Sequence, residues 1–266
     1  DDDRPLVDAV LAARGVDGEW VAWDDGAVDW SRFDAAWIRS TWNYTERHDA
    51  FVEWVARVDG LTALWNPAGV VRWNSHKSYL LDLAEEGVAV VPTVLVPAGQ
   101  QLDVGALLEE RGWDEAVVKP AVAVGAIGAA RVERGQRQVV AATSGADRLV
   151  QPLVREVASG EVSIVVVDGR VTHAVRKIPA EGDFRVHREY GGREVVHQPT
   201  AAELDLATRA LAAVGEPLLY ARVDCVPTAE GPLLMELELI EPSLFLWLAP
   251  DTAGAALGDA VAGRLR

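Results

Sequence analysis

The sequence predicts an α/β (α+β) protein built from three lobes. Its 266 residues, of which 50% are hydrophobic, are enough to bury several cores. Helical and strand-like segments alternate as far as about residue 75, which is typical of a small parallel sheet. Later strand-like segments follow one another across tight turns, as in antiparallel sheets. We therefore expect an N-terminal lobe of residues 1–75, a small central lobe of residues 76–150 and a C-terminal lobe of residues 151–266.

The first lobe alternates its elements from the start of the chain. The pattern predicts helices over 5–14 and 48–58 and strands over 19–23, 35–39 and 62–65. Because an α/β lobe normally begins with a strand and this chain opens at Asp1, we expect a first strand to be missing. The polar stretch Arg39–Trp42 would lie at the carboxyl end of a strand, where open α/β sheets bind ligands. A polar loop that caps the next helix is the alternative.

A helix is expected from Asn74, as its N-cap, to Gly87. Lys77 would lie in its first turn, where the positive end of the helix disfavours a cation. This placement is explained if an anion binds there, although a plain surface lysine fits equally well.

The central lobe carries a second lysine at the end of a strand. A strand over 88–93 leads into the lobe, and Ala116–Pro120 reads as a buried strand that contains Lys119. The small residues of 121–130 form a loop whose backbone N–H groups can approach a phosphate closely. A simple hairpin tip is the alternative for this loop.

The C-terminal lobe adds two more cations. Strands are expected over 149–154, 160–167 and 171–177, with a tight turn at Asp168-Gly169 and a helix over 201–214. Lys177 ends the third of these strands, and Arg185 follows in a Gly-Asp-Phe-Arg segment. His187 lies nearby and is a candidate for substrate contact.

Two glutamates interrupt the apolar run Leu234–Leu239. As a strand, this run would turn Glu236 and Glu238 to one face and its apolar side chains, Met235 included, to the other. Two like charges about 7 Å apart among apolar neighbours destabilise a strand unless a cation lies between them.

A third acid is expected opposite this pair. Asp224 lies in the strand-like run 218–226, and a turn separates the two runs. If the turn is centred near Ala229 or Glu230, Asp224 faces Glu236 and Arg222 faces Glu238. Three carboxylates on one hairpin predict a site for a hard cation, best fitted by magnesium. Ordinary surface acids on a solvated strand are the alternative, which the flanking Leu and Val residues disfavour.

The composition of the chain limits the kinds of partner that it can bind and the compartment in which it works. The net charge of −16 argues against nucleic-acid and anionic-membrane partners and favours a small-molecule substrate. The single cysteine, Cys225, rules out an internal disulfide and fits a reducing cytoplasm, where it is expected in the core. No run reaches transmembrane length and no signal peptide is visible, so we expect a cytoplasmic protein. A homodimer is the default expectation for the oligomeric state.

Cations from different lobes together with acids on one hairpin describe a site for a nucleoside triphosphate and magnesium. In this combination the chain resembles the ATP-grasp superfamily, in particular its short members similar to bacterial glutathione synthetase. The resemblance is strongest from Asn74 onward. The runs Arg72–Leu80 and Ile240–Phe245 also resemble a subgroup that includes the cycloserine-forming cyclo-ligase.

The resemblance implies a role for each motif. Val117–Pro120 looks like the lysine strand of the central lid lobe, and the hinge that meets adenine corresponds to Gln151, Pro152, Leu153 and Val154. Glu161 corresponds to the ribose contact. Lys77 and Lys119 would bind the α- and β-phosphates, Lys177 and Arg185 would stabilise the transferred group, and Arg222 would fix a substrate carboxylate or neutralise Glu238. The metal ligands would be Asp224, Glu236 and Glu238, although many relatives carry Asn at the last position.

The activity implied is ADP-forming ligation with ATP and Mg²⁺, for which Mn²⁺ is an alternative. A small amino-acid-like carboxylate would become an acyl phosphate and be joined to an amine, either of a second molecule or, as in a cyclo-ligase of natural-product biosynthesis, of the same one. Two other functions remain open at this point: a small-molecule kinase with the same ATP site, and a nucleotide-binding regulator without turnover.

Overall fold

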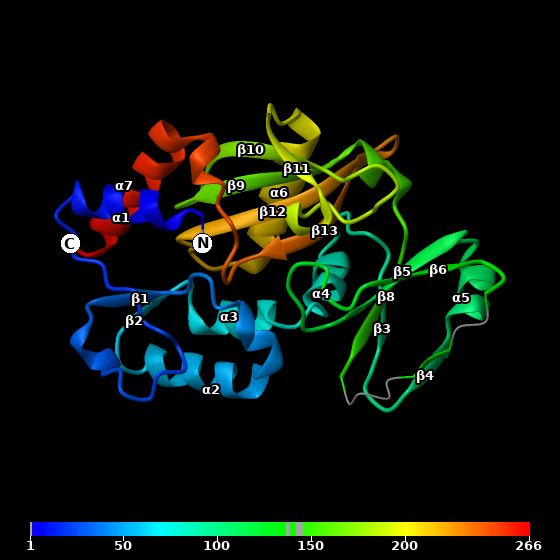
Figure 1. Cartoon of the computed structure of the whole chain (residues 1–266), viewed down its shortest axis with the longest axis horizontal. Coiled ribbons are helices and arrows are strands. Elements are labelled where there is room, and N and C mark those ends of the chain that lie inside the picture. The colour runs from blue at the N-terminus through cyan, green and yellow to red at the C-terminus, as the bar shows by residue number, and fades with distance from the viewer. Residues whose placement is uncertain (1, 137–138, 142–145) are drawn as a thin grey trace.

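The computed structural model has three lobes, as the sequence predicts (Figure 1). It describes residues 2–136, 139–141 and 146–266. Helices and mainly antiparallel sheets are mixed throughout, which confirms the expected α+β class. Within these described ranges, no helix has both the length and the apolar character needed to cross a membrane.

The N-terminal lobe contains a small parallel sheet. Strand β1 (Ala35–Trp37) pairs in parallel with β2 (Ala63–Trp65), and the helices α2 (His48–Asp59) and α3 (Ala68–Asn74) accompany it. The strand expected over 19–23 is wrong: residues 19–22 have no regular secondary structure, Trp23 lies in a turn, and the stretch joins no hydrogen-bonded ladder.

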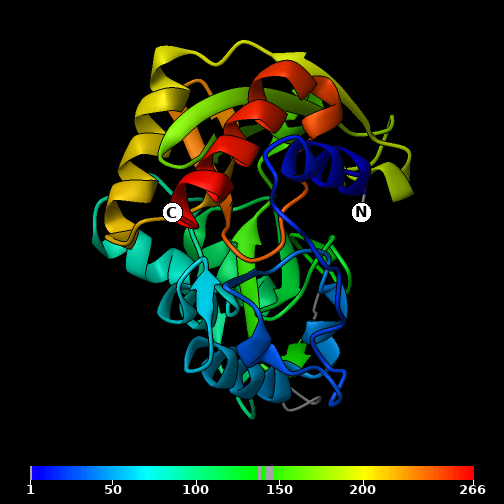
Figure 2. The ribbon, with the colours of Figure 1, turned by 90° about the vertical axis from the view of Figure 1, so that its left-hand side faces the viewer.

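The first helix packs away from this small sheet. Helix α1 (Arg4–Ala12) lies against α7 (Ala255–Arg264), with Val7 and Leu11 in the same apolar cluster as strand residues of the C-terminal lobe (Figure 2). Just before α1, the fully buried Asp3 forms an ion pair with Arg39, at 3.0 Å between Oδ2 and Nη2.

The central lobe is a four-stranded antiparallel sheet covered by one helix. Its strand order is β3-β8-β5-β6, and a second pair, β4-β7, lies beside it. Helix α5 packs onto this sheet, begins at the N-cap Asp103 and ends at Gly112, whose φ of 67° suits glycine. The bounds are β3 (Val94–Val96), β4 (Gln101–Asp103), α5 (Val104–Arg111), β5 (Glu115–Pro120), β6 (Ala130–Glu133), β7 (Val139–Ala141) and β8 (Arg148–Pro152).

The C-terminal lobe is a five-stranded antiparallel sheet between two helical layers. The strands lie in the order β11-β10-β9-β12-β13. Along β9, Val162 and Ile164 face a core shared with α4 and α6, whereas Val165 and Val167 face α1 and α7. The bounds are α4 (Tyr79–Glu85), β9 (Glu161–Val167), β10 (Arg170–Ile178), β11 (Arg193–His197), α6 (Ala201–Val214), β12 (Tyr220–Thr228) and β13 (Gly231–Glu238).

The register of the β12–β13 hairpin is confirmed. Asp224 pairs with Glu236 and Arg222 with Glu238, on either side of a turn at residues 229 and 230. A β-bulge follows Asp224, because Cys225 pairs with Leu234 and leaves Met235 as an extra residue. The expectation that Met235 shares a face with Leu237 and Leu239 is therefore wrong. The bulge turns its side chain to the same cavity as Glu236.

The expected helix 74–87 is also wrong in its first part. Asn74 is the last residue of α3, and its buried amide bonds the backbone of β13 at Leu237 and Leu239. A side chain used in this way cannot cap a helix. Helix α4 therefore begins only at Tyr79, and Lys77 lies in the connection between α3 and α4.

Candidate active site

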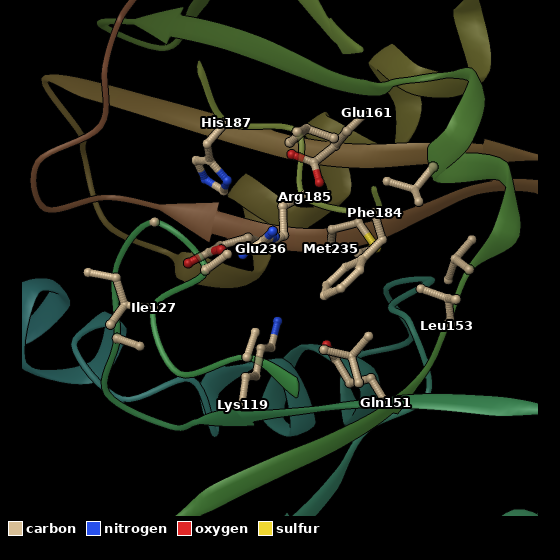
Figure 3. A pocket seen from close by; sticks show the side chains of 18 of the residues that line it. Lys119, Ile127, Gln151, Leu153, Glu161, Phe184, Arg185, His187, Met235 and Glu236 are labelled. Atoms are coloured by element: carbon tan, nitrogen blue, oxygen red, sulfur yellow. The ribbon is translucent and has the colours of Figure 1, made fainter. Parts of the chain in front are cut away.

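Two adjoining cavities lie where the lobes meet. Cavity A, about 120 Å³, is bounded by Lys119 and Gln151 of the central lobe and by Glu161 and Met235 of the C-terminal lobe (Figure 3). Cavity B, about 630 Å³, extends towards the N-terminal lobe and the segment that follows β13. Lys77, His187 and Glu236 line both cavities, so the two adjoin at these side chains.

The lysines of this protein are confined to the site. The sequence contains three, Lys77, Lys119 and Lys177, among 25 basic residues, and each lines cavity A or cavity B. A protein that uses arginine almost everywhere else has thus placed all of its lysines around one space. The small number of lysines is thus a signal of the site that the sequence itself carries.

Lys77 and Lys119 project towards the same space but differ in their partners. The Lys77 ammonium donates to Glu236 Oε1 at 2.6 Å and to the Ala123 carbonyl at 2.8 Å. Within the described residues, the Lys119 ammonium forms no hydrogen bond or ion pair, and burial lowers its pKa. Lys119 is therefore a cation without an anionic partner, directed into cavity A (Figure 3).

Lys177 joins two acids beneath the cavities. Its ammonium bonds Asp224 Oδ2 at 2.9 Å and also pairs with Glu161. Burial alone would lower the pKa of Lys177, but the Asp224 and Glu161 carboxylates outweigh it and raise the pKa. Glu161 is thus already engaged by Lys177, and its carboxylate lines cavity A from there.

Arg222 completes the charged network on β12. It bonds Asp224, at 2.9 Å between Nη2 and Oδ2, and pairs with Glu238. Burial would raise the pKa of Asp224, but Arg222 and Lys177 together hold it well below its usual range. For Glu238, burial outweighs Arg222 and raises the pKa to about 7.

The remaining predicted residues surround cavity A. The side-chain amide of Gln151 donates to Thr93 at 2.8 Å, while Pro152, Leu153 and Val154 form an apolar wall. Arg185 also lines cavity A, where it bonds Asp183 at 2.7 Å and lies over the Tyr190 ring. The structure thus brings every predicted nucleotide-binding residue to the same cavity.

The three predicted metal ligands lie on one face of the hairpin, but each forms an ion pair with a lysine or an arginine. Glu236 bonds Lys77, Glu238 pairs with Arg222, and Asp224 bonds both Lys177 and Arg222. Asp224 also accepts a hydrogen bond of 2.6 Å from Ser163. In the described part of the chain, no group of three or more Asp, Glu, His or Cys side chains is arranged to hold a metal ion.

One predicted contact is corrected and two residues are added. Arg39 does not reach cavity A or B, because its buried guanidinium bonds Asp3 and the Pro242 carbonyl. From the same loop, Trp42 and the buried Tyr44 line cavity B instead. Tyr44 and Met235 were missed. No sequence signal marks Met235, because a bulge is invisible in the apolar pattern.

The comparisons with known proteins identify the family of the chain. Residues 1–66 match the family described as D-cycloserine synthetase DcsG, N-terminal domain, and residues 84–242 match the RimK-like ATP-grasp domain. The cycloserine biosynthesis protein DcsG of Streptomyces lavendulae is 34% identical over 290 aligned positions, covering 98% of this chain and 93% of that protein. A probable alpha-L-glutamate ligase of a Picosynechococcus strain is 32% identical and covers 58% of this chain.

Solved structures show the same relationship. The crystal structure of D-cycloserine synthetase DcsG matches with a TM-score of 0.88 and 32% identity, over 100% of this chain and 95% of that one. The ATP-grasp ligase PsnB, at 18% identity, shares the fold with a TM-score of 0.67 over 100% of this chain. These matches confirm the ATP-grasp fold and the use of ATP. The chain therefore belongs to the RimK-like ATP-grasp family and is an ATP-dependent ligase.

Proposed function

We propose that this ligase closes a ring within one small amino-acid-like molecule, as a cyclo-ligase of natural-product biosynthesis. The substrate carboxylate is activated by ATP and is then attacked by a nitrogen of the same molecule. A cycloserine-type ring is the product class, in keeping with the relative that matches nearly the whole chain. The observation that carries the proposal is that cavities A and B lie side by side and share Lys77, His187 and Glu236 in their walls.

In this proposal the base of ATP occupies cavity A and the triphosphate extends towards cavity B. The base lies against Leu153, Phe184 and Met235, and the α- and β-phosphates are neutralised by Lys119 of cavity A and by Lys77, which lines both cavities. Arg185 and Lys177 face the transferred phosphoryl group, which carries spread negative charge in its transition state. The polar hinge amide of Gln151 is fixed by Thr93, so it holds the wall of the base pocket rather than a ligand.

The acids of β13 fit a divalent cation. Glu236 and Glu238 both line cavity B, and burial, together with the neighbouring Glu236 and Asp224 charges, raises the pKa of Glu238 in spite of Arg222. We propose that these two carboxylates hold Mg²⁺, or Mn²⁺ as the alternative, and that Asp224 takes part only where Lys177 or Arg222 releases it. The ion would supply positive charge to the β- and γ-phosphates.

The chemistry then has two steps. A carboxylate oxygen of the substrate attacks the γ-phosphorus, the bond to the β-phosphate oxygen breaks, and ADP and an acyl phosphate result. The substrate nitrogen attacks the acyl carbon next, the carbon–oxygen bond to phosphate breaks, and the nitrogen loses a proton. Arg222, at the wall of cavity B, is placed to bind the carboxylate or the departing phosphate.

The simplest substrate probe follows from the product class. Hydrolysis of the ring amide of cycloserine gives β-aminooxyalanine, so the D and L forms of this amino acid are the probes. Each is incubated with the enzyme, ATP and Mg²⁺, and the products are identified by mass spectrometry. Ring closure gives ADP, phosphate and a product lighter than the probe by one water. Joining of two molecules gives the mass of both less one water.

The same experiment decides between this function and the others. A stable phosphorylated probe would favour a small-molecule kinase, and ATP binding without ADP release from any probe or pooled amino acid would favour a regulator. Either result would overturn the cyclo-ligase proposal. A small-molecule substrate, a cytoplasmic location and a homodimeric state stay predictions from the sequence.

A further inference from the structure

Glu241 is a buried carboxylate that faces cavity B without a counter-ion. Its residue is only 8% exposed, and it lines cavity B beyond the acids of β13. In the described part of the chain, no other side chain forms a hydrogen bond or ion pair with its carboxylate. A buried acid in this state is costly unless a bound group compensates it.

The cations of cavity B are already engaged with other acids. Each Lys or Arg side chain that lines the cavity has at least one acidic partner of its own. The pairs are Lys77–Glu236, Lys177–Glu161, Lys177–Asp224, Arg188–Asp2, Arg188–Glu194, Arg222–Asp224 and Arg222–Glu238. Each of these cations is therefore already paired with another acid, and none forms an ion pair with Glu241.

The backbone around Glu241 is fixed on both sides. The Tyr220 hydroxyl donates to the Ile240 carbonyl at 2.6 Å, and Arg39 donates to the Pro242 carbonyl at 2.8 Å. Both donors are buried. The backbone that carries Glu241 is thus held in place before any ligand arrives, which favours recognition by its side chain.

Aromatic side chains also line cavity B. Trp42, Tyr44, Phe245 and Trp247 belong to its wall, as Glu241 does. A cavity lined by an acid and by aromatic rings favours an ammonium group. Burial raises the pKa of Glu241 to about 8, with the neighbouring Glu238 charge adding to the effect, so the empty cavity favours the protonated acid. A bound ammonium would favour the ionised form.

We propose that Glu241 is the specificity-determining residue of the acceptor cavity, and that it selects substrates with a protonated primary amine that takes no part in ring closure. This inference rests on the proposed function and assigns to Glu241 a role in recognition rather than in chemistry. A carboxylate–ammonium contact in a buried site lowers the dissociation constant of a ligand by about 10- to 100-fold.

The test compares two probes that differ only in that amine. β-Aminooxyalanine carries it, and β-aminooxypropanoic acid has hydrogen in its place. ADP release gives kcat/KM for each probe with the wild-type enzyme and with Glu241→Gln, Glu241→Asp and Glu189→Gln. Glu189 is an exposed acid of the same cavity and serves as the matched control. Circular dichroism and Tm check that each variant folds.

We expect the wild-type enzyme to prefer the amine-bearing probe and Glu241→Gln to reduce this preference by about 10- to 100-fold. The KM for ATP and the Mg²⁺ dependence should not change, Glu241→Asp should keep part of the preference, and Glu189→Gln should keep all of it. Equal kcat/KM values for the two probes with the wild-type enzyme would overturn the inference. Equal loss on both probes in Glu241→Gln would do so too, because it would indicate a role in catalysis, metal binding or folding.

Failure of the proposed function is recognised separately. If neither probe yields ADP, ring closure of this substrate class fails, and the inference is judged by binding alone. Calorimetry with ADP and Mg²⁺ present then compares cycloserine with the same ring lacking its amino group. Tighter binding of cycloserine that is lost in Glu241→Gln supports the inference, and equal binding of the two rings overturns it.

Discussion

Replacement of Lys119 by methionine is expected to change stability and ATP binding in opposite directions. Lys119 has no anionic partner among the described residues, and burial lowers its pKa in the folded protein. Since the folded state then disfavours the protonated lysine, this residue costs stability at neutral pH. Methionine has a similar volume and no charge. The ligand-free variant should therefore be more stable than the wild type and unfold at a higher Tm.

Bound ATP should stabilise the variant less than it stabilises the wild type. At a concentration of 100 times its Kd, a ligand stabilises the wild type by about 2.7 kcal/mol. Loss of one charge-assisted phosphate contact costs about 1.5–3 kcal/mol, which raises the Kd roughly 10- to 100-fold. At the same ligand concentration, the variant should then gain only about 0.4–1.4 kcal/mol. Differential scanning calorimetry with and without a non-hydrolysable ATP analogue and Mg²⁺ measures both quantities.

Lys119→Arg is the matched control, because it keeps the positive charge on the same strand. It should retain most of the stabilisation by the ATP analogue. The placement of the triphosphate would be refuted if Lys119→Met kept the full wild-type shift. A ligand-free variant less stable than the wild type would show instead that Lys119 has a stabilising partner in the folded protein.

Three further predictions concern the site and its support. Glu236→Gln should abolish ADP release while Tm changes little, and near-normal turnover would remove Glu236 from the phosphate end of the site. The pKa of His187 is lowered by burial to about 4, so the wild type should lose stability as the pH falls from about 6.5 to about 4. We expect the free energy of unfolding of His187→Asn, measured by urea titration, to rise relative to that of the wild type by about 1–3 kcal/mol as the pH falls across that range. If the difference between the two free energies stayed the same at every pH, the lowered pKa would be contradicted. Asn66 is fully buried, and its side-chain amide donates to two backbone carbonyls and accepts from one backbone N–H. Asn66→Ala should therefore lower the free energy of unfolding in urea by about 3–5 kcal/mol. A cost below about 1 kcal/mol would mean that other groups satisfy these atoms.

The parts of the site that depend on local pattern could be predicted from the sequence. The turn at residues 229 and 230 sets the register of its hairpin, so the pairing of Asp224 with Glu236 followed from counting along the strands. Helix α6 was also predictable, because Thr200 and Glu203 form a capping box and Gly215 ends the helix. In each case the residues that decide the structure are close together in the chain.

The parts that depend on distant contacts could not be predicted. Asn74 has the composition of a helix cap, yet its amide bonds strand residues more than 160 positions away. From the sequence, Arg39 is a candidate for ligand binding. In the structure its guanidinium instead donates hydrogen bonds to Asp3 and to the Pro242 carbonyl. The bulge at Met235 inserts one residue without altering the hydrophobic pattern, so alternation along the strand assigned Met235 to the wrong face.

The confinement of all three lysines to the site has a practical consequence for covalent chemistry on this protein. Reagents that acylate amines find no lysine on the open surface, since Lys77, Lys119 and Lys177 are reached only through the two cavities. Labelling, crosslinking or immobilisation through lysine side chains would therefore report on, and block, the ligase site itself. Attachment elsewhere on the molecule calls for another functional group, and Cys225 is buried in the core.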